Sequence, residues 1–263
     1  MTDRVYVVSG AGRGLGRASA VQLGAEGARL VLTDHDEAAL ATVAKGLGGS
    51  ERAIAVSGDL AEGGFETCLT AAAVARYGRL DGAVICLDDE ESGTLAATSD
   101  ESWRVAFEGT FLGPIRLARS VAHNVSNEGG SVLFILSRSA REPRANHAIG
   151  AGLVPGVAMA ARGLAGELGA RNIRVNMLLP GHVEPDAGPF PGALGRARDD
   201  LAGNERDPIT AEEGRRFAEN ATALGRFGEA MEFARPAVFL LSPASSYVTG
   251  SVLVVDGGLA RSG

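Results

Sequence analysis

Short apolar runs alternate with longer helical patterns along most of the chain. The apolar runs predict strands at Val5–Ser9, Arg29–Thr33, Ala53–Val56, Gly82–Leu87, Ser131–Leu136, Arg174–Leu179 and Ser251–Val255. The patterns between them predict helices at Leu15–Ala25, Glu37–Leu47, Gly64–Tyr77, Ser99–Asn124, Ala151–Gly169 and Glu229–Leu241. Because the strands are apolar throughout rather than alternating, they indicate a parallel sheet that helices cover on both faces.

The expected fold class is therefore α/β, a three-layer doubly wound parallel sheet of the Rossmann type with about seven strands in a single domain, 1–263. No linker or internal repeat interrupts the pattern. Right-handed crossovers put a ligand crevice at the carboxyl ends of the strands. Residues 184–220 begin as a Pro- and Gly-rich loop and turn helical around Ala211–Asn220, which predicts a lid-like region.

Composition and charge narrow the possible partners. The formal net charge is -7, and the 25 basic residues, all arginine except Lys45, are scattered along the chain. A nucleic-acid partner would need a clustered basic face, so none is expected. The two cysteines, Cys68 and Cys86, have no redox or metal spacing and are expected to be buried free thiols. The four histidines show no ligand spacing, so no metal is expected.

The chain carries no sign of export or membrane insertion. It runs from Asp3 and Arg4 straight into the first strand, without a signal-peptide segment. We find no apolar run long enough to span a membrane, so no membrane partner is expected. The expected location is the cytoplasm.

A glycine cluster links the first strand to the first helix. Its sequence is Ser9-Gly10-Ala11-Gly12-Arg13-Gly14-Leu15-Gly16. Glycines in this context allow a tight turn and close approach of a pyrophosphate to the helix N-terminus. Asp34 ends the second strand, where a carboxylate can accept hydrogen bonds from an adenosine ribose. A helix N-cap or turn residue is the alternative interpretation of Asp34.

At this point the sequence resembles the classical short-chain dehydrogenase/reductase family. The resemblance rests on the Gly10-x-x-x-Gly14-x-Gly16 spacing, Asp59-Leu60, Arg174-Val175-Asn176, Pro180-Gly181 and the tail Thr249–Gly258. It implies NAD as cofactor, held by Gly10, Arg13, Gly14, Leu15, Gly16, Asp34, Asp59, Leu60, Pro180, Gly181 and Val183. Asp34 favours NAD over NADP because a carboxylate repels a 2′-phosphate. Arg13 weakly favours NADP, because a basic residue at that position can contact the phosphate.

The residues that do the family's chemistry are absent. Family members use a Tyr-x-x-x-Lys dyad, a Ser and a supporting Asn. Register puts Gly150 in the Tyr position, Val154 in the Lys position and Thr110 in the Asn position, with Ser137 the sole remnant. The Asn-Asn-Ala-Gly motif is Ile85-Cys86-Leu87-Asp88, and Pro185 stands for a cofactor-binding Thr. The chain has three tyrosines, none between positions 78 and 246, and only one lysine, Lys45.

Other residues offer alternatives for chemistry near the crevice. Ser139, Arg141, Arg144, Asn146 and His147 lie between Ser137 and Gly150, and His147 could act as a general base. We favour an ordinary solvated basic loop here. No Gly-x-Ser-x-Gly elbow supports a serine hydrolase. The acidic run Asp88–Glu91 would weaken dinucleotide binding if it faced the pyrophosphate.

Three hypotheses for function follow. We rank first an NAD(H)-binding family member with an eroded catalytic site, acting as a non-catalytic or regulatory subunit. The second is an enzyme of altered chemistry, such as a dehydratase, isomerase or lyase that uses the Ser139–His147 loop. The third is an oxidoreductase with a non-standard proton donor. The small residues of Ala151–Gly169, and the resemblance, predict a homotetramer or homodimer, or a hetero-oligomer with an intact relative.

Overall fold

The computed structural model describes residues 1–87, 93–143, 146–184 and 211–259, which are built around one parallel sheet. Its seven strands follow the order β3-β2-β1-β4-β5-β6-β7. Their bounds are β1 Val5–Ser9, β2 Arg29–Thr33, β3 Ala53–Ala55, β4 Gly82–Cys86, β5 Gly130–Ile135, β6 Ile173–Pro180 and β7 Val252–Val255. All neighbouring strands pair in parallel. The predicted strands are therefore confirmed to within one residue at each end.

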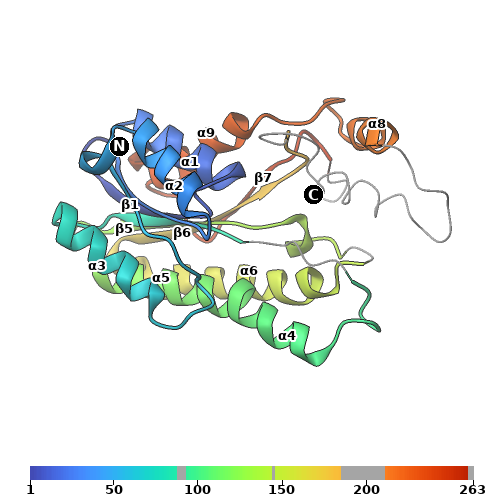
Figure 1. The fold of residues 1–263 in the computed structure, drawn as a ribbon, viewed down its shortest axis with the longest axis horizontal. Helices are drawn as coiled ribbons and strands as arrows, with labels where there is room; N and C mark the ends of the chain where they lie inside the picture. Colours follow the sequence, from blue (N-terminus) through green and yellow to red (C-terminus); the bar gives the residue numbers. More distant parts are fainter. Residues whose placement is uncertain (88–92, 144–145, 185–210, 260–263) are drawn as a thin grey trace.

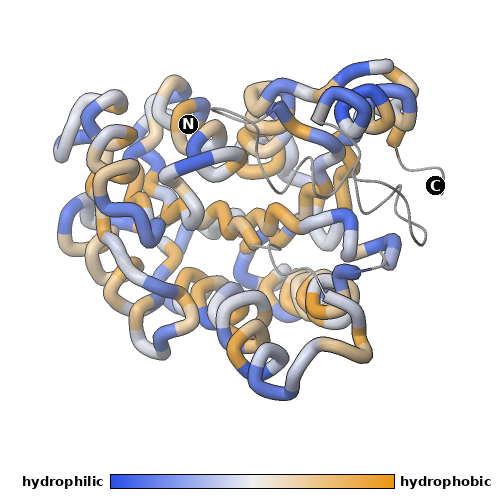
Figure 2. Tube along the Cα trace, turned by 45° about the vertical axis from the view of Figure 1, so that its right-hand side comes forward, coloured by the Kyte–Doolittle hydropathy of each residue, from blue (hydrophilic) through white to orange (hydrophobic). Residues whose placement is uncertain are grey.

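Helices cover both faces of this sheet (Figure 1). On one face lie α1 (Gly14–Ala25), α2 (Glu37–Gly46) and α9 (Ala230–Leu241). On the other lie α3 (Phe65–Tyr77), α4 (Asp100–Ala106), α5 (Gly113–Asn124) and α6 (Ala148–Leu168). Buried apolar side chains form a separate core cluster on each side of the sheet, and the strands between the layers are strongly hydrophobic (Figure 2). The predicted three-layer, doubly wound fold is confirmed.

The strand order fixes where a ligand crevice can form. From β1 the chain moves outward through β2 and β3, and then returns to place β4 on the other side of β1. This reversal between β1 and β4 is the topological switch point, and ligands of open α/β sheets bind beside it at the carboxyl ends of the strands. The loops after β1, β2, β3 and β6, which carry the predicted cofactor residues, all leave the sheet at that edge.

The prediction of one continuous helix over Ser99–Asn124 is wrong in detail. The chain forms α4, then a π-helical turn, η2 (Phe107–Leu112), and then α5. Pro114 lies in the first turn of α5 and has no N–H to donate to the helical turn before it. Gly109, Gly113 and Pro114 are poor helix formers, but the apolar spacing of this stretch stays helical and does not reveal the change of hydrogen-bonding register. Such π turns occur frequently at functional sites.

One helix is more apolar than we expected. The segment Ala148–Arg171, which comprises α6 and the turn after it, is long and apolar enough to span a membrane. The prediction that the chain has no apolar run of this length is therefore wrong. The same helix supplies Val154, Val157 and Ala161 to the core cluster on its side of the sheet. Burial against the sheet accounts for this apolar composition, because the core helix of an α/β domain meets the same criteria.

The cysteine prediction is half wrong. Neither cysteine forms a disulfide, as predicted, but Cys68 is exposed and Cys86 is only partly buried. Cys68 lies on the outward face of α3, and Cys86 is the last residue of β4, where the strand leaves the core. The helix predicted around Ala211–Asn220 is confirmed as α8 (Ala211–Ala221). Residues 185–210 of the predicted lid-like region lie outside the described residues.

Candidate functional site

The glycine cluster forms a tight turn from β1 into α1. Gly10 and Gly14 have positive φ angles, 64° and 52°, which favour glycine. A Cβ atom on Gly16 would lie 2.1 Å from the Gly10 carbonyl oxygen, so only glycine lets α1 start this close to the strand. Leu15 packs against the core, and Arg13 is the exposed N-cap residue of α1. The turn therefore points the N-terminus of α1 toward the crevice.

Asp34 lies directly against this turn. Its Oδ2 accepts the Gly12 N–H at 3.0 Å, and its Oδ1 accepts the Asp36 N–H at 3.3 Å. The N-cap of α2 is Asp36, whose side chain accepts the Ala39 N–H at 2.9 Å. Asp34 is therefore not the helix N-cap, but its bond to the Asp36 N–H makes it a turn residue, the other part of the alternative interpretation. A partly exposed carboxylate remains at the rim of the glycine turn.

The loop after β3 brings Asp59 and Leu60 to the same edge. Asp59 is partly exposed, and its Oδ1 accepts the Ala61 N–H at 2.7 Å, which fixes a local turn. A Cβ atom on Gly113 would lie 2.6 Å from the Leu60 carbonyl oxygen. The first residue of α5 therefore packs on the Leu60 backbone, which holds this loop beside the switch point.

The loop after β6 forms the other end of the crevice. A Cβ atom on Gly181 would come within 2.6 Å of the Asp256 Cα, so glycine is needed after Pro180. Val183 pairs with Gly228 through two hydrogen bonds, from the Glu184 N–H to the Gly228 carbonyl and from the Gly228 N–H to the His182 carbonyl, each 2.9 Å. Within the described residues, the Val183 N–H and carbonyl have no hydrogen-bond partner.

The positions that correspond to the family's catalytic residues converge on α6, η2 and the end of β5. Ser137 is half-buried, and its Oγ accepts the Ser139 N–H at 3.3 Å as the cap of a short turn, η3 (Arg138–Ala140). Gly150 and Val154 are buried on α6. Thr110 lies within the π turn η2, partly buried. Pro185 and the acidic run Asp88–Glu91 are outside the described residues.

The tyrosines and the lysine lie away from this site. Tyr6 pairs with the second residue of β2 and the first of β4, and its hydroxyl donates to the Leu241 carbonyl at 3.4 Å. Burial raises the pKa of Tyr6 to about 12. Tyr77 ends α3, Tyr247 precedes β7, and Lys45 is in the last turn of α2. All four side chains therefore belong to the amino edge of the sheet, opposite the crevice.

The loop after Ser137 is not the solvated loop that we favoured. Ser139 is 2% exposed and His147 is 4% exposed, so both are buried. His147 also pairs with Gly93, and the Ala148 N–H donates to the Gly93 carbonyl at 3.1 Å. Arg141 remains exposed, and Arg144 lies outside the described residues. A run of polar residues does not reveal this burial, because the burial depends on a loop that is distant in the sequence.

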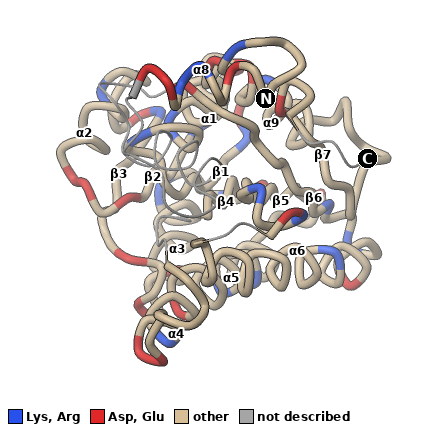
Figure 3. Tube along the Cα trace, turned by 90° about the vertical axis from the view of Figure 1, so that its right-hand side faces the viewer, with Lys and Arg blue, Asp and Glu red and all other residues tan. Residues whose placement is uncertain are grey.

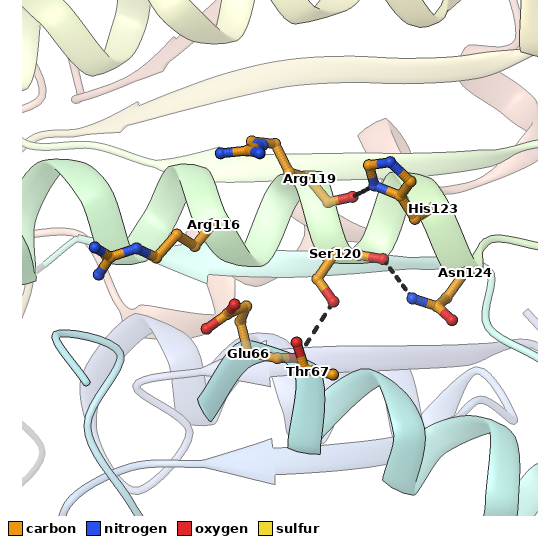
Figure 4. Close-up of a pocket in the computed structure, with 7 residues that line it drawn as sticks. All are labelled: Glu66, Thr67, Arg116, Arg119, Ser120, His123 and Asn124. Atoms are coloured by element: carbon orange, nitrogen blue, oxygen red, sulfur yellow. Dashed lines mark hydrogen bonds between the residues drawn. The ribbon is translucent and has the colours of Figure 1, made fainter. Parts of the chain in front are cut away.

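One described cavity lies elsewhere, in an open groove of about 440 Å³ between α3 and α5 (Figure 4). Its walls are polar: Glu66, Thr67, Arg116, Arg119, Ser120, His123 and Asn124. The Arg116 guanidinium pairs with Glu108 at 2.8 Å, and His123 Nδ1 bonds the Arg119 carbonyl at 2.7 Å. This groove is on the outer side of the helical layer and shares no residue with the crevice. No cluster of three metal-ligating side chains occurs within the described ranges.

The sequence placed Cys86 at the Asn-Asn-Ala-Gly position and predicted a buried free thiol there, but it did not predict the contact of Cys86 with the glycine turn. A Cβ atom on Gly10 would lie 3.2 Å from the Cys86 Cβ, so this side chain forms the floor beneath the glycine turn. The Cys86 N–H donates to Ser9 Oγ at 3.0 Å, which ties the ends of β1 and β4 together. Its position at the end of β4, the neighbour of β1 across the switch point, is the signal that could have found it.

The adenosine half of the crevice fits a dinucleotide. The glycine turn leaves an open cradle at Gly14, where an added Cβ atom would meet nothing within 4 Å, whereas a Cβ atom on Gly12 would lie 3.0 Å from Asp34 Oδ2. Backbone N–H groups there suit a pyrophosphate, and the carboxylate suits a ribose hydroxyl pair. The other half offers the Val183 backbone and Ser137, with no ionisable proton donor of the Tyr–Lys type.

Comparisons with known proteins agree with this geometry. A family model described as enoyl-(acyl carrier protein) reductase matches residues 10–260. The short-chain reductase protein NovJ of Streptomyces niveus is 32% identical over 260 residues, covering 97% of this chain and 94% of its own length.

Two solved structures are similar over nearly their whole length. A short-chain dehydrogenase/reductase (glucose/ribitol dehydrogenase) from Brucella melitensis has a TM-score of 0.85 and 28% identity, covering 100% of this chain and 98% of the other. A short-chain oxidoreductase from Pseudomonas aeruginosa PAO1, described as containing an atypical catalytic center, has a TM-score of 0.83 and 26% identity, covering 99% and 98%.

Proposed function

This chain belongs to the short-chain dehydrogenase/reductase family, and on that premise we propose that it binds NAD(H) without carrying out Tyr–Lys-dependent carbonyl chemistry. Its role in this proposal is that of a non-catalytic or regulatory subunit. The observation that carries the proposal is the asymmetry of the crevice. The glycine turn and Asp34 keep a cradle at one end, whereas every tyrosine and the lysine lie at the opposite edge of the sheet.

The loss of the dyad has a large energetic consequence for carbonyl reduction. A positioned general acid contributes about 10²–10⁴ in rate, and the missing Lys would also have lowered the acid's pKa and held the ribose. The buried Val154 supplies only apolar surface, and Gly150 supplies no side chain. Ser137 can still polarise a carbonyl, but its hydroxyl is a poor proton donor on its own.

The proposed cofactor is NAD rather than NADP. The Asp34 carboxylate at the rim of the turn would repel a 2′-phosphate, which carries the same sign of charge. Arg13, exposed beside the same turn, is the residue that would oppose this preference. No metal enters the proposal.

The proposed partner is a second copy of the chain or a catalytically intact relative. Val105, Phe107 and Met159 are apolar side chains on α4, η2 and α6 that are 60%, 40% and 57% exposed. Farther along α6, Gly163 and Gly166 have open space around them, which allows close approach of another helix. Gly152 and Gly156, by contrast, pack on Trp103 and Phe111 of the same chain.

Co-expression tests the partner directly. The chain carries an affinity tag, the nearest intact family member from the same genome does not, and the captured material is analysed by mass. A mixed oligomer in which the tagged chain raises the activity or stability of its partner is the expected result. Exclusive homo-oligomers would count against the regulatory role.

A second candidate, an enzyme of altered chemistry, draws support from the burial of Ser139 and His147 beside the crevice. The similar oxidoreductase from Pseudomonas aeruginosa is described as containing an atypical catalytic center, so a departure from the usual catalytic residues occurs in that protein. A reaction abolished by both His147→Gln and Ser139→Ala, in variants that still fold, would favour this candidate over the first.

A further inference from the structure

Arg215 of the short helix α8 contacts the crevice rim. The Arg215 guanidinium forms a two-point ion pair with Glu184, with its Nη1 3.2 Å from Oε2 and its Nη2 bonded to Oε1. Its Nε also donates to Glu219 Oε1 at 2.8 Å within α8. Figure 3 shows residues of both signs on this helix. Arg215 is thus fully engaged by two carboxylates from two separate segments.

The same guanidinium also covers an aromatic ring. Its Cζ lies 5.0 Å from the centre of the Phe227 ring, within the range of a cation–π contact. Phe227 is buried, packs with Ala218 of α8, and contacts the His182 ring with centroids 5.5 Å apart. Arg215 therefore joins three chain segments: α8, the loop after β6, and the segment that leads into α9.

These segments hold the part of the rim nearest to the candidate nicotinamide end. Glu184 and His182 flank Val183, and their backbone groups make the two hydrogen bonds to Gly228. Phe227 precedes Gly228. An arginine that holds Glu184 and Phe227 together consequently holds both partners of the Val183–Gly228 bridge.

We propose that Arg215 is a positioning residue that keeps the Val183 backbone in place to receive the nicotinamide end of the cofactor. This inference rests on the proposed function. Exposed ion pairs usually contribute little, but a bidentate arginine within a network is the exception. We call the ion pair between Arg215 and Glu184 the clamp. Its side chains are 47% and 37% exposed, so the clamp should also weaken with added salt.

The test compares Arg215→Ala with Arg216→Ala. Arg216 is the adjacent residue of the same helix, is 72% exposed and, among the described residues, forms an ion pair with Glu212 of α8 alone. Hydrogen exchange of the Glu184 and Gly228 amides reports the bridge without any nucleotide. Arg215→Ala is expected to speed their exchange about fivefold to tenfold, and Arg215→Lys less, because lysine cannot make the two-point contact. Equal exchange in the Arg215→Ala and Arg216→Ala variants would overturn the clamp.

Nucleotide titration separates positioning from general damage. ADP-ribose contains every part of NAD except the nicotinamide, so it does not require the Val183 backbone. We expect Arg215→Ala to weaken NAD binding about fivefold to tenfold and ADP-ribose binding less than about twofold. Equal weakening of both would overturn the positioning role. If the unmodified protein binds neither nucleotide, the proposed function fails, while the exchange comparison still decides the clamp.

Discussion

The Asp34 carboxylate and the Gly12 N–H form the contact on which cofactor choice depends in this account. A ribose with two free hydroxyls can donate to such a carboxylate, whereas a 2′-phosphate would bring a second negative charge to the same place. The contact also explains why position 12 is glycine, since a Cβ atom would crowd both Asp34 and Ala39. Cofactor preference is therefore a property that single substitutions can measure.

We expect Asp34→Ala to weaken NAD binding about tenfold, the cost of losing a hydrogen bond to a charged group, and to reduce the preference over NADP. Calorimetric titration with both dinucleotides measures this. Asp36→Ser is the matched control, because it removes a neighbouring carboxylate but keeps a side chain able to cap α2. Tighter binding of NADP than of NAD by the unmodified protein would show that this interpretation of Asp34 is wrong.

Glu232 gives a pH-dependent prediction at the start of α9. The Arg226 guanidinium and the Glu229 backbone lower the pKa of Glu232 from 4.5 to about 2. Because the folded-state pKa is the lower one, its charge stabilises the fold above pH 4.5, and this contribution is lost as the pH falls from 4.5 toward 2.

Thermal unfolding of Glu232→Gln should therefore show a lower Tm than the parent near neutral pH, with the gap narrowing below pH 4.5. The control is Glu167→Gln, at an exposed residue of α6 that makes no ion pair with any other described residue. A difference in Tm between Glu232→Gln and the parent that stays constant across this pH range would contradict the stabilising role of the Glu232 charge.

Among the elements, the turn between β1 and α1 has the strictest steric requirement. Gly16→Ala places a methyl group against the Gly10 carbonyl, and we expect it to lower the free energy of unfolding by about 1–3 kcal/mol. Gly46→Ala adds the same group at an exposed position of α2 with open space around it, and should raise stability by up to about 0.5–1 kcal/mol. Denaturant titration distinguishes them, and similar effects of both would refute the packing argument.

The outer surface of α4 and α6 carries the oligomerisation prediction. Met159→Asp puts a charge in the exposed apolar surface, and we expect light scattering to report a smaller species than for the parent. Val21→Asp, on α1 at the opposite layer, is the control for adding a charge. An unchanged mass of the Met159→Asp variant, or a monomeric parent, would mean that α4 and α6 pack only within their own subunit and form no interface.

Some elements of the fold could be predicted from the sequence alone, and others could not. Buried parallel strands are uniformly apolar, so their positions could be predicted to within one residue. The π turn around Thr110 could not be predicted, because it depends on which hydrogen bonds the packed helix keeps rather than on its hydrophobic period. The burial of His147 was missed for a similar reason, since its partner Gly93 is more than fifty residues away.

At the scale of the whole molecule, the carboxyl edge of the sheet has two unequal halves. The adenosine half near β1, β2 and β3 combines a glycine turn, two carboxylates and a helix N-terminus. The half near β5, β6 and α6 has a capping serine, two buried apolar positions and the Val183 backbone. In the proposed function, the first half binds the nucleotide, and the second half lacks the Tyr–Lys pair that would donate the proton for reduction.

The central claim, binding without standard turnover, can be tested in a single sample. NADH is titrated into the protein while its own fluorescence reports binding, and a panel of simple ketones is then added while NADH consumption is followed. The account predicts saturable binding and no NADH consumption above the protein-free rate. Robust consumption with any of these ketones, or failure of NADH to bind at all, would contradict it.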